Sequence, residues 1–63
     1  DPIEAIKFRM EQMGMKPKDL APIIGNKSSV TEILKKETKL TLNMIRNLYT
    51  KLNISLESLI KEY

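Results

Sequence analysis

The chain has 63 residues with no Cys, His or Trp, and its 11 Lys and Arg against 8 Asp and Glu give a formal net charge of +3. Without Cys or His it offers no disulfide, no Cys/His zinc site and no histidine general base, so we expect a binding module rather than an enzyme, with no metal or cofactor. The longest apolar run, Leu20–Ile24, is short and contains Pro22. It predicts neither a membrane span nor a secretory segment, and we expect a cytoplasmic protein.

Apolar residues recur at spacings of three and four, which predicts an all-α domain of five short helices. The first helix is expected over Pro2–Met13, because Pro2 suits a first turn and Gly14 the left-handed position after the last turn. Phe8 lies off the apolar stripe of this helix and is expected to be exposed, packing on a partner or on a preceding segment. The stripe itself consists of Ile3, Ile6, Met10 and Met13.

A second helix is predicted from Pro17 to the glycine at position 25. Pro22 inside it removes the backbone bond to the carbonyl of Lys18, an interior cost of about 3 kcal/mol, so we expect a kinked or partly 3₁₀ helix. The residues expected to face the core are Leu20, Ala21 and Ile24.

Three more helices are predicted from their caps. Asn26 suits the N-cap of a helix over Lys27–Lys35, Thr41 caps a fourth helix that Asn53 ends, and Ser55 caps a short last one. We expect the polar segment Lys35–Lys39 to be a loop. The residues expected in the core are Val30, Ile33 and Leu34, then Met44 or Ile45, Leu48 and Leu52, then Leu56, Leu59 and Ile60.

Several apolar residues have two interpretations. Leu42, Tyr49 and Tyr63 raise the question of a dimer surface. The methionines fit either an adaptable binding surface or the core, and their helical spacing favours the core. They are Met10, Met13, Met15 and Met44.

The spacing of Ala21, Gly25 and Val30 is that of two helices that cross closely. A small residue permits the approach, a glycine permits a turn with positive φ, and a branched aliphatic side chain fixes the crossing. This spacing favours a helix-turn-helix over about residues 17–35.

Three stretches carry a resemblance: Asp19-Leu20-Ala21-Pro22 to a D-L-x-P motif, Gly25–Leu34 to G-S-K-S-x-V-S-x-V-L, and Leu40-Thr41-Leu42 to L-T-L. With these motifs the chain resembles the Cro/Xre helix-turn-helix family, and within it the DNA-binding domain of the HigA-type antitoxins, over nearly its whole length. Where that family has a capping glycine after the recognition helix, this chain has Lys35-Lys36.

The resemblance implies a lambda-repressor-like domain covering residues 1–63, and we expect it to be a piece of a longer chain. It implies a sequence-specific transcriptional repressor that binds a palindromic operator in double-stranded DNA as a homodimer, and it suggests a toxin protein as a further partner. The alternative is a protein-interaction module that keeps the fold without binding DNA.

The basic side chains gather in residues 26–51, which carry six Lys and Arg against two Glu. In a helix-turn-helix the first residues of the second helix enter the major groove, and the loop after it follows the phosphates. Glu32 can accept from a cytosine amine or pair with Lys35 or Lys36. Asn43 begins the next helix, where a phosphate can bind. The candidate DNA-binding residues are Asn26, Lys27, Ser28, Ser29, Thr31, Glu32, Lys35, Lys36, Lys39 and Asn43, and the alternative for all of them is a solvated polar surface.

Overall fold

The computed structural model describes all 63 residues and contains five α-helices and no strand. The prediction of an all-α chain with five short helices is therefore confirmed. No helix is both long and apolar enough to cross a membrane. The helices are α1 (Pro2–Met13), α2 (Pro17–Ile24), α3 (Lys27–Leu34), α4 (Leu42–Leu52) and α5 (Leu56–Leu59).

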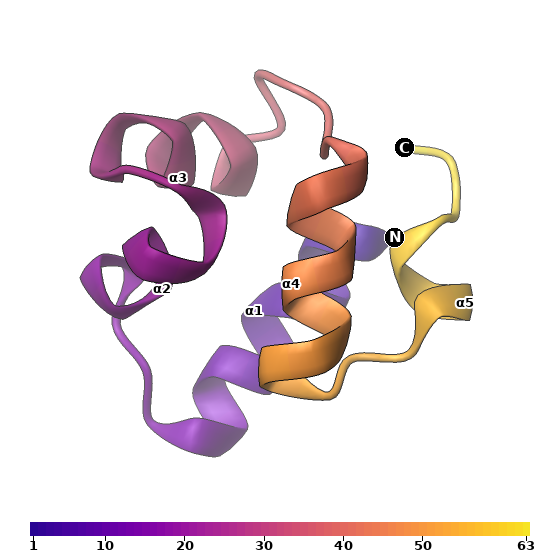
Figure 1. The fold of residues 1–63 in the computed structure, drawn as a ribbon, viewed down its shortest axis with the longest axis horizontal. Coiled ribbons are helices and arrows are strands. Elements are labelled where there is room, and N and C mark those ends of the chain that lie inside the picture. The colour runs from indigo at the N-terminus through magenta and orange to yellow at the C-terminus, as the bar shows by residue number, and fades with distance from the viewer.

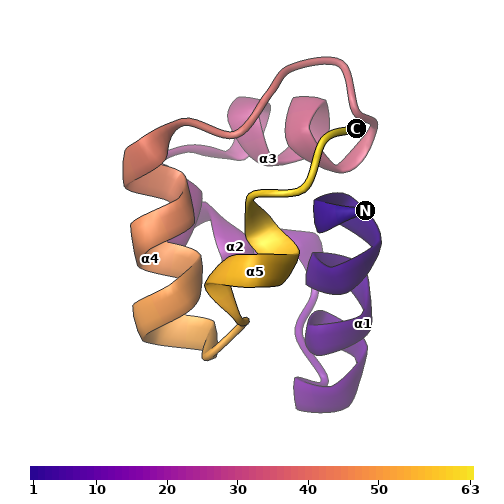
Figure 2. The ribbon, with the colours of Figure 1, turned by 90° about the vertical axis from the view of Figure 1, so that its right-hand side faces the viewer.

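The helices form a small bundle in which α2 and α3 lie together on one side (Figure 1). α2 packs most extensively on α3 and then on α4, while α5 packs against both α1 and α4. Figure 2 shows α5 between α4 and α1, with both chain ends near the loop that follows α3. α3 therefore packs on α2 with one side, while the side chains on its other side remain exposed to solvent.

Capping side chains fix the helix ends as the sequence indicates. Asn26 accepts a hydrogen bond from the backbone N–H of Ser29 at 2.8 Å. Thr41 and Ser55 cap α4 and α5 in the same way. Gly14 and Asn53 take left-handed conformations after α1 and α4, with φ of 66° and 56°. The structure confirms these predictions. The caps could be predicted because each depends only on neighbouring residues.

The core is built from twelve buried apolar residues supplied by every helix and by the segment before α5. The predicted residues of α3 and α4 lie in it or against it, with both Met44 and Ile45 half-buried. The buried set is Ile3, Ile6, Met10, Leu20, Ile23, Ile24, Val30, Ile33, Leu48, Leu52, Ile54 and Leu59.

The structure corrects the predicted core at the end of α1 and around α5. Met13 is 47% exposed, because it ends α1 where that helix projects past its neighbours (Figure 2). Leu56 and Ile60 are 43% and 67% exposed, because α5 is a single turn and only Leu59 points inward. Met15 packs partly against the core and Phe8 is exposed, as expected.

Two further differences concern α2. Ile23, not assigned to the core from sequence, is buried. Ala21 is half-buried and packs against the core, as predicted. The side chain of Asn47 on α4 donates to the carbonyl of Ile23 at 3.1 Å, so α4 covers this end of α2. Of the kink or 3₁₀ turn expected here, the 3₁₀ turn is absent, since α2 is α-helical from Pro17 to Ile24. Pro22 lacks only its own N–H and so removes one backbone bond from this helix.

Candidate nucleic-acid interface

The two-residue connection between α2 and α3 sets the geometry of the candidate interface. Gly25 has a φ of 138°, which side-chain-bearing residues rarely adopt, and its N–H donates to the carbonyl of Ala21 at 2.7 Å. Val30 is almost fully buried. The small residue, the glycine turn and the buried aliphatic residue therefore lie at the junction of the two helices.

The outward face of α3 consists of polar side chains. Lys27, Ser28, Thr31 and Glu32 are exposed and Ser29 is half-buried, while Val30 and Ile33 face the core. Burial of these two aliphatic side chains fixes the rotation of α3 about its axis, so the polar face has one orientation.

Some of these polar groups already have partners inside the chain. The Asn26 side-chain oxygen is occupied by the N-cap bond. The Thr31 hydroxyl donates to the carbonyl of Lys27 at 3.4 Å, which leaves its lone pairs open to a donor. Lys27, Ser28 and Glu32 have no side-chain hydrogen bond or ion pair, so Glu32 does not form the helix pair that the sequence also allowed.

A second cation, which sequence reasoning missed, lies beside Lys27. A hollow of about 80 Å³ where α2 begins is lined by Pro17, Lys18, Lys27, Val30 and Thr31. Lys18 is the second residue of α2, and the predicted packing of α2 against α3 was the signal that could have identified it. The packing of α2 against α3 places Lys18 and Lys27 at one edge of the α3 face.

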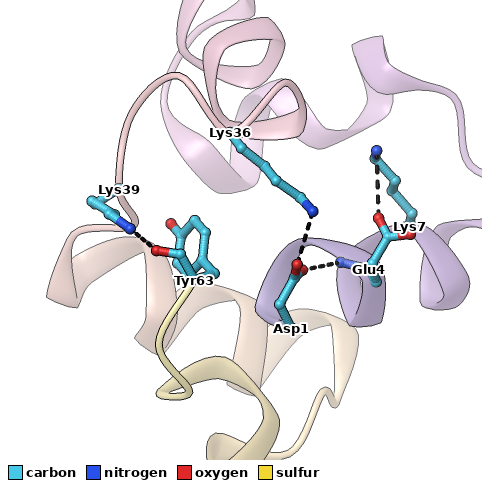
Figure 3. Close-up of polar contacts among 6 residues, drawn as sticks. All are labelled: Asp1, Glu4, Lys7, Lys36, Lys39 and Tyr63. Carbon is cyan, nitrogen blue, oxygen red and sulfur yellow. Dashed lines mark hydrogen bonds and ion pairs between the residues drawn. The ribbon is translucent and has the colours of Figure 1, made fainter.

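The loop lysines differ sharply in what they contact (Figure 3). The ammonium of Lys36 lies 2.8 Å from a carboxylate oxygen of Asp1. The ammonium of Lys39 donates to the backbone carbonyl of Tyr63 and lies 4.2 Å from the centre of its ring. Lys35 is exposed and has no ion pair. Two of the three loop lysines are therefore held by the ends of the chain.

Lys36 also ends α3 in place of a glycine. It has a φ of 64°, and its N–H donates to the carbonyl of Ile33, while the N–H of Glu37 donates to that of Glu32. These two bonds are the Schellman pattern, in which glycine usually takes the left-handed position. The backbone of Lys36 is fixed by this turn, and only its side chain is free to move.

Asn43 lies at the second position of α4, exposed and without a side-chain hydrogen bond. The loop of residues 35–41 connects the end of α3 to the start of α4 (Figure 1). The structure thus gathers the candidates of α3 on one face and leaves Asn43 at the start of the next helix.

A second surface is apolar. A hollow of about 490 Å³ lies between the start of α4 and the C-terminal segment, with Leu40, Ile45, Ile60 and Tyr63 among its lining residues. The Tyr63 hydroxyl accepts from the N–H of Leu40 at 2.8 Å, which holds the C-terminal segment over the loop. Tyr63 is half-buried, whereas Leu42 and Tyr49 on α4 are exposed.

Comparison with known proteins identifies no relative: no protein-family model, curated protein or solved structure matches the chain.

Proposed function

We propose that this chain is the DNA-binding domain of a transcriptional repressor, with α2 and α3 as the helix-turn-helix of a lambda-repressor-like domain. The observation that carries the proposal is the outward face of α3, whose exposed polar side chains are largely unused by the chain itself. In such domains the first residues of the second helix contact base edges in the major groove.

The dimensions of α3 support this function. With its side chains an α-helix is about 10–12 Å across, which fits the major groove of B-DNA, about 12 Å wide. Lys27 and Ser28 in the first turn can donate to guanine or to a phosphate, and Thr31 presents a hydroxyl and a methyl group one turn further on. Glu32 accepts from a cytosine amine and disfavours bases that present only acceptors.

The charges on the edges of this face suit phosphates. Lys18 lies beside Lys27 at one end of α3, and Lys35 follows its other end without an ion pair. Contacts of lysines with phosphates add affinity without sequence information. Lys36 and Lys39 each already donate one hydrogen bond within the chain, and the carboxylate of Asp1 offsets the charge of Lys36.

The resemblance to the HigA-type antitoxins supports a more specific role. As such a domain, the chain represses its own operon from the cytoplasm and works alongside a toxin protein. A homodimer reads two half-sites about 34–36 Å apart on a palindromic operator. The apolar surface of Leu42, Tyr49 and the hollow around Ile60 suits contact between copies, and Phe8 is a candidate contact for another protein.

A protein-interaction module without DNA binding is the second candidate. It is favoured by the pair of Lys36 with Asp1, which offsets one positive charge of the loop, and by the bond that holds the Lys39 ammonium to Tyr63. The 62% exposure of Phe8 also favours it. In this case the chain holds a protein partner and does not bind duplex DNA.

Selection from a random duplex library, followed by binding measurements on the selected sequence, tests the proposal. Thr31→Val should relax base preference, since it removes the hydroxyl from the α3 face. Thr50→Val is a matched control, because Thr50 is also exposed and also donates to the carbonyl four residues back, but from α4. No retention on duplex DNA at low salt, together with a stable protein partner, would establish the second candidate instead.

A further inference from the structure

Asp1 makes two bonds that join the start of α1 to the end of α3. One carboxylate oxygen accepts from the backbone N–H of Glu4 at 2.9 Å and caps α1. The other lies 2.8 Å from the ammonium of Lys36 (Figure 3). The Asp1 side chain is 25% exposed, so this pair is closer and less solvated than the pair of Lys7 with Glu4, at 3.6 Å and 62% exposure of the glutamate.

We infer that Asp1 competes with the phosphates of a nucleic acid for Lys36, and that it thereby sets how strongly the positive charge of Lys36 attracts a nucleic-acid backbone. This inference rests on the proposed function. A carboxylate and a phosphate oxygen are both anionic acceptors for a lysine ammonium. The carboxylate of Asp1 uses one of the three N–H donors of Lys36 and offsets its positive charge, so Lys36 adds less to the attraction of DNA than an unpaired lysine does.

The backbone geometry makes Lys36 suited to such an exchange. Its main chain is fixed in the left-handed turn that ends α3, so the ammonium moves only by rotation of the side chain. Because the pair is partly exposed, the free energy that holds it is small, and a phosphate can displace Asp1. Lys35, one residue earlier, has no carboxylate partner and contributes its charge at all times.

Neutralising Asp1 tests this competition, with affinity measured by fluorescence anisotropy on a mixed-sequence duplex of about 20 base pairs and salt varied from about 50 to 200 mM. Asp1→Asn is the informative variant, because asparagine caps a helix as well as aspartate does. Asp1→Ser is a second neutral cap, and circular dichroism verifies that α1 is retained. Glu11→Gln is the matched control, since Glu11 is also exposed on α1 but has no ion pair.

Relative to Glu11→Gln, Asp1→Asn should tighten binding by about 1.5- to 5-fold, the range that an exposed ion pair supports. The salt dependence should steepen by up to about one unit. In a chain that also carries Lys36→Gln, Asp1→Asn and Glu11→Gln should have the same effect, because the ammonium whose charge Asp1 offsets is gone.

Two results overturn the inference and separate it from the proposed function. If the unmodified chain binds duplex DNA but Asp1→Asn equals Glu11→Gln, Asp1 does not compete for Lys36 and the proposed function stands. If the unmodified chain fails to bind duplex DNA at about 50 mM salt, the proposed function fails and the competition fails with it.

Discussion

Arg9 on α1 donates through Nε to the backbone carbonyl of Leu52, the last residue of α4, at 2.7 Å. The last carbonyls of a helix have no partner within it, and a cationic donor there is favoured by the helix dipole. Arg9 is half-buried, and its second contact is with Gln12 on its own helix. A single side chain thus caps α4 and ties it to α1, across 43 positions of the sequence.

Arg9→Ala should lower the free energy of unfolding by about 1–2 kcal/mol, because it leaves the Leu52 carbonyl without its charged donor. In a domain of this size that corresponds to a fall in melting temperature of roughly 4–8 °C per kcal/mol. Lys7→Ala is the control, since Lys7 is exposed on the same helix and should cost less than about 0.5 kcal/mol. Equal melting temperatures for the two variants would contradict a capping role.

Gly25→Ala should destabilise the domain by about 1–3 kcal/mol in thermal or urea unfolding. An added Cβ at Gly25 meets no atom within 4 Å, so the cost comes from the φ of 138° and not from a clash. At Gly14, with a φ of 66°, Asn should be better tolerated than Ala, because Asn accepts the left-handed region. Gly25→Asn should stay costly, and a mild effect there would show that the turn between α2 and α3 can relax.

The end of α3 predicts a reversal of the usual order of glycine and alanine. At position 36, Gly should be more stable than Ala by about 1 kcal/mol, because both lack the ion pair with Asp1 and only Gly is unstrained at a φ of 64°. At position 35, where φ is −89°, Gly should be the less stable of the two. Urea unfolding of the four variants measures both differences, and the same order at both positions would exclude the left-handed turn.

Leu59→Ala should lower the free energy of unfolding by about 2–5 kcal/mol, since Leu59 is the one residue of α5 in the core. Ile60→Ala, the neighbouring change, should be close to neutral because Ile60 is largely exposed. Thermal melts of the two variants at low protein concentration give the comparison. A large loss at Ile60 under those conditions would contradict its exposure in the single chain, whereas a loss that appears only at high protein concentration would place it in an interface between copies.

The helix caps and the residues around α5 show which parts of the fold could be predicted from the sequence and which could not. The caps at Asn26 and Thr41 were predicted correctly, because a cap depends on residues three positions apart. Burial of Ile54 and exposure of Leu56 could not be predicted, since they depend on which neighbours cover a segment too short to show a helical period.

The candidate site likewise has one part that could be predicted from the sequence and one part that could not. The outward face of α3 follows from the spacing of Val30 and Ile33, so its polar residues could be identified from local pattern. The pair of Lys36 with Asp1 joins residues 35 positions apart, and no local pattern encodes it. Sequence reasoning therefore grouped the loop lysines together, although the structure separates Lys35 from the other two.

Lys35→Gln should weaken binding to duplex DNA almost equally for all sequences and flatten the slope of log affinity against log salt by about one unit. The reason is that Lys35 follows the last turn of α3 and is exposed without an ion pair, so its charge is available to a phosphate. Lys51→Gln is the control, because Lys51 carries the same charge on the last turn of α4, at the end farthest from α3 (Figure 1). If both variants flatten the slope equally, DNA responds to the net charge of the domain and α3 does not define the binding face.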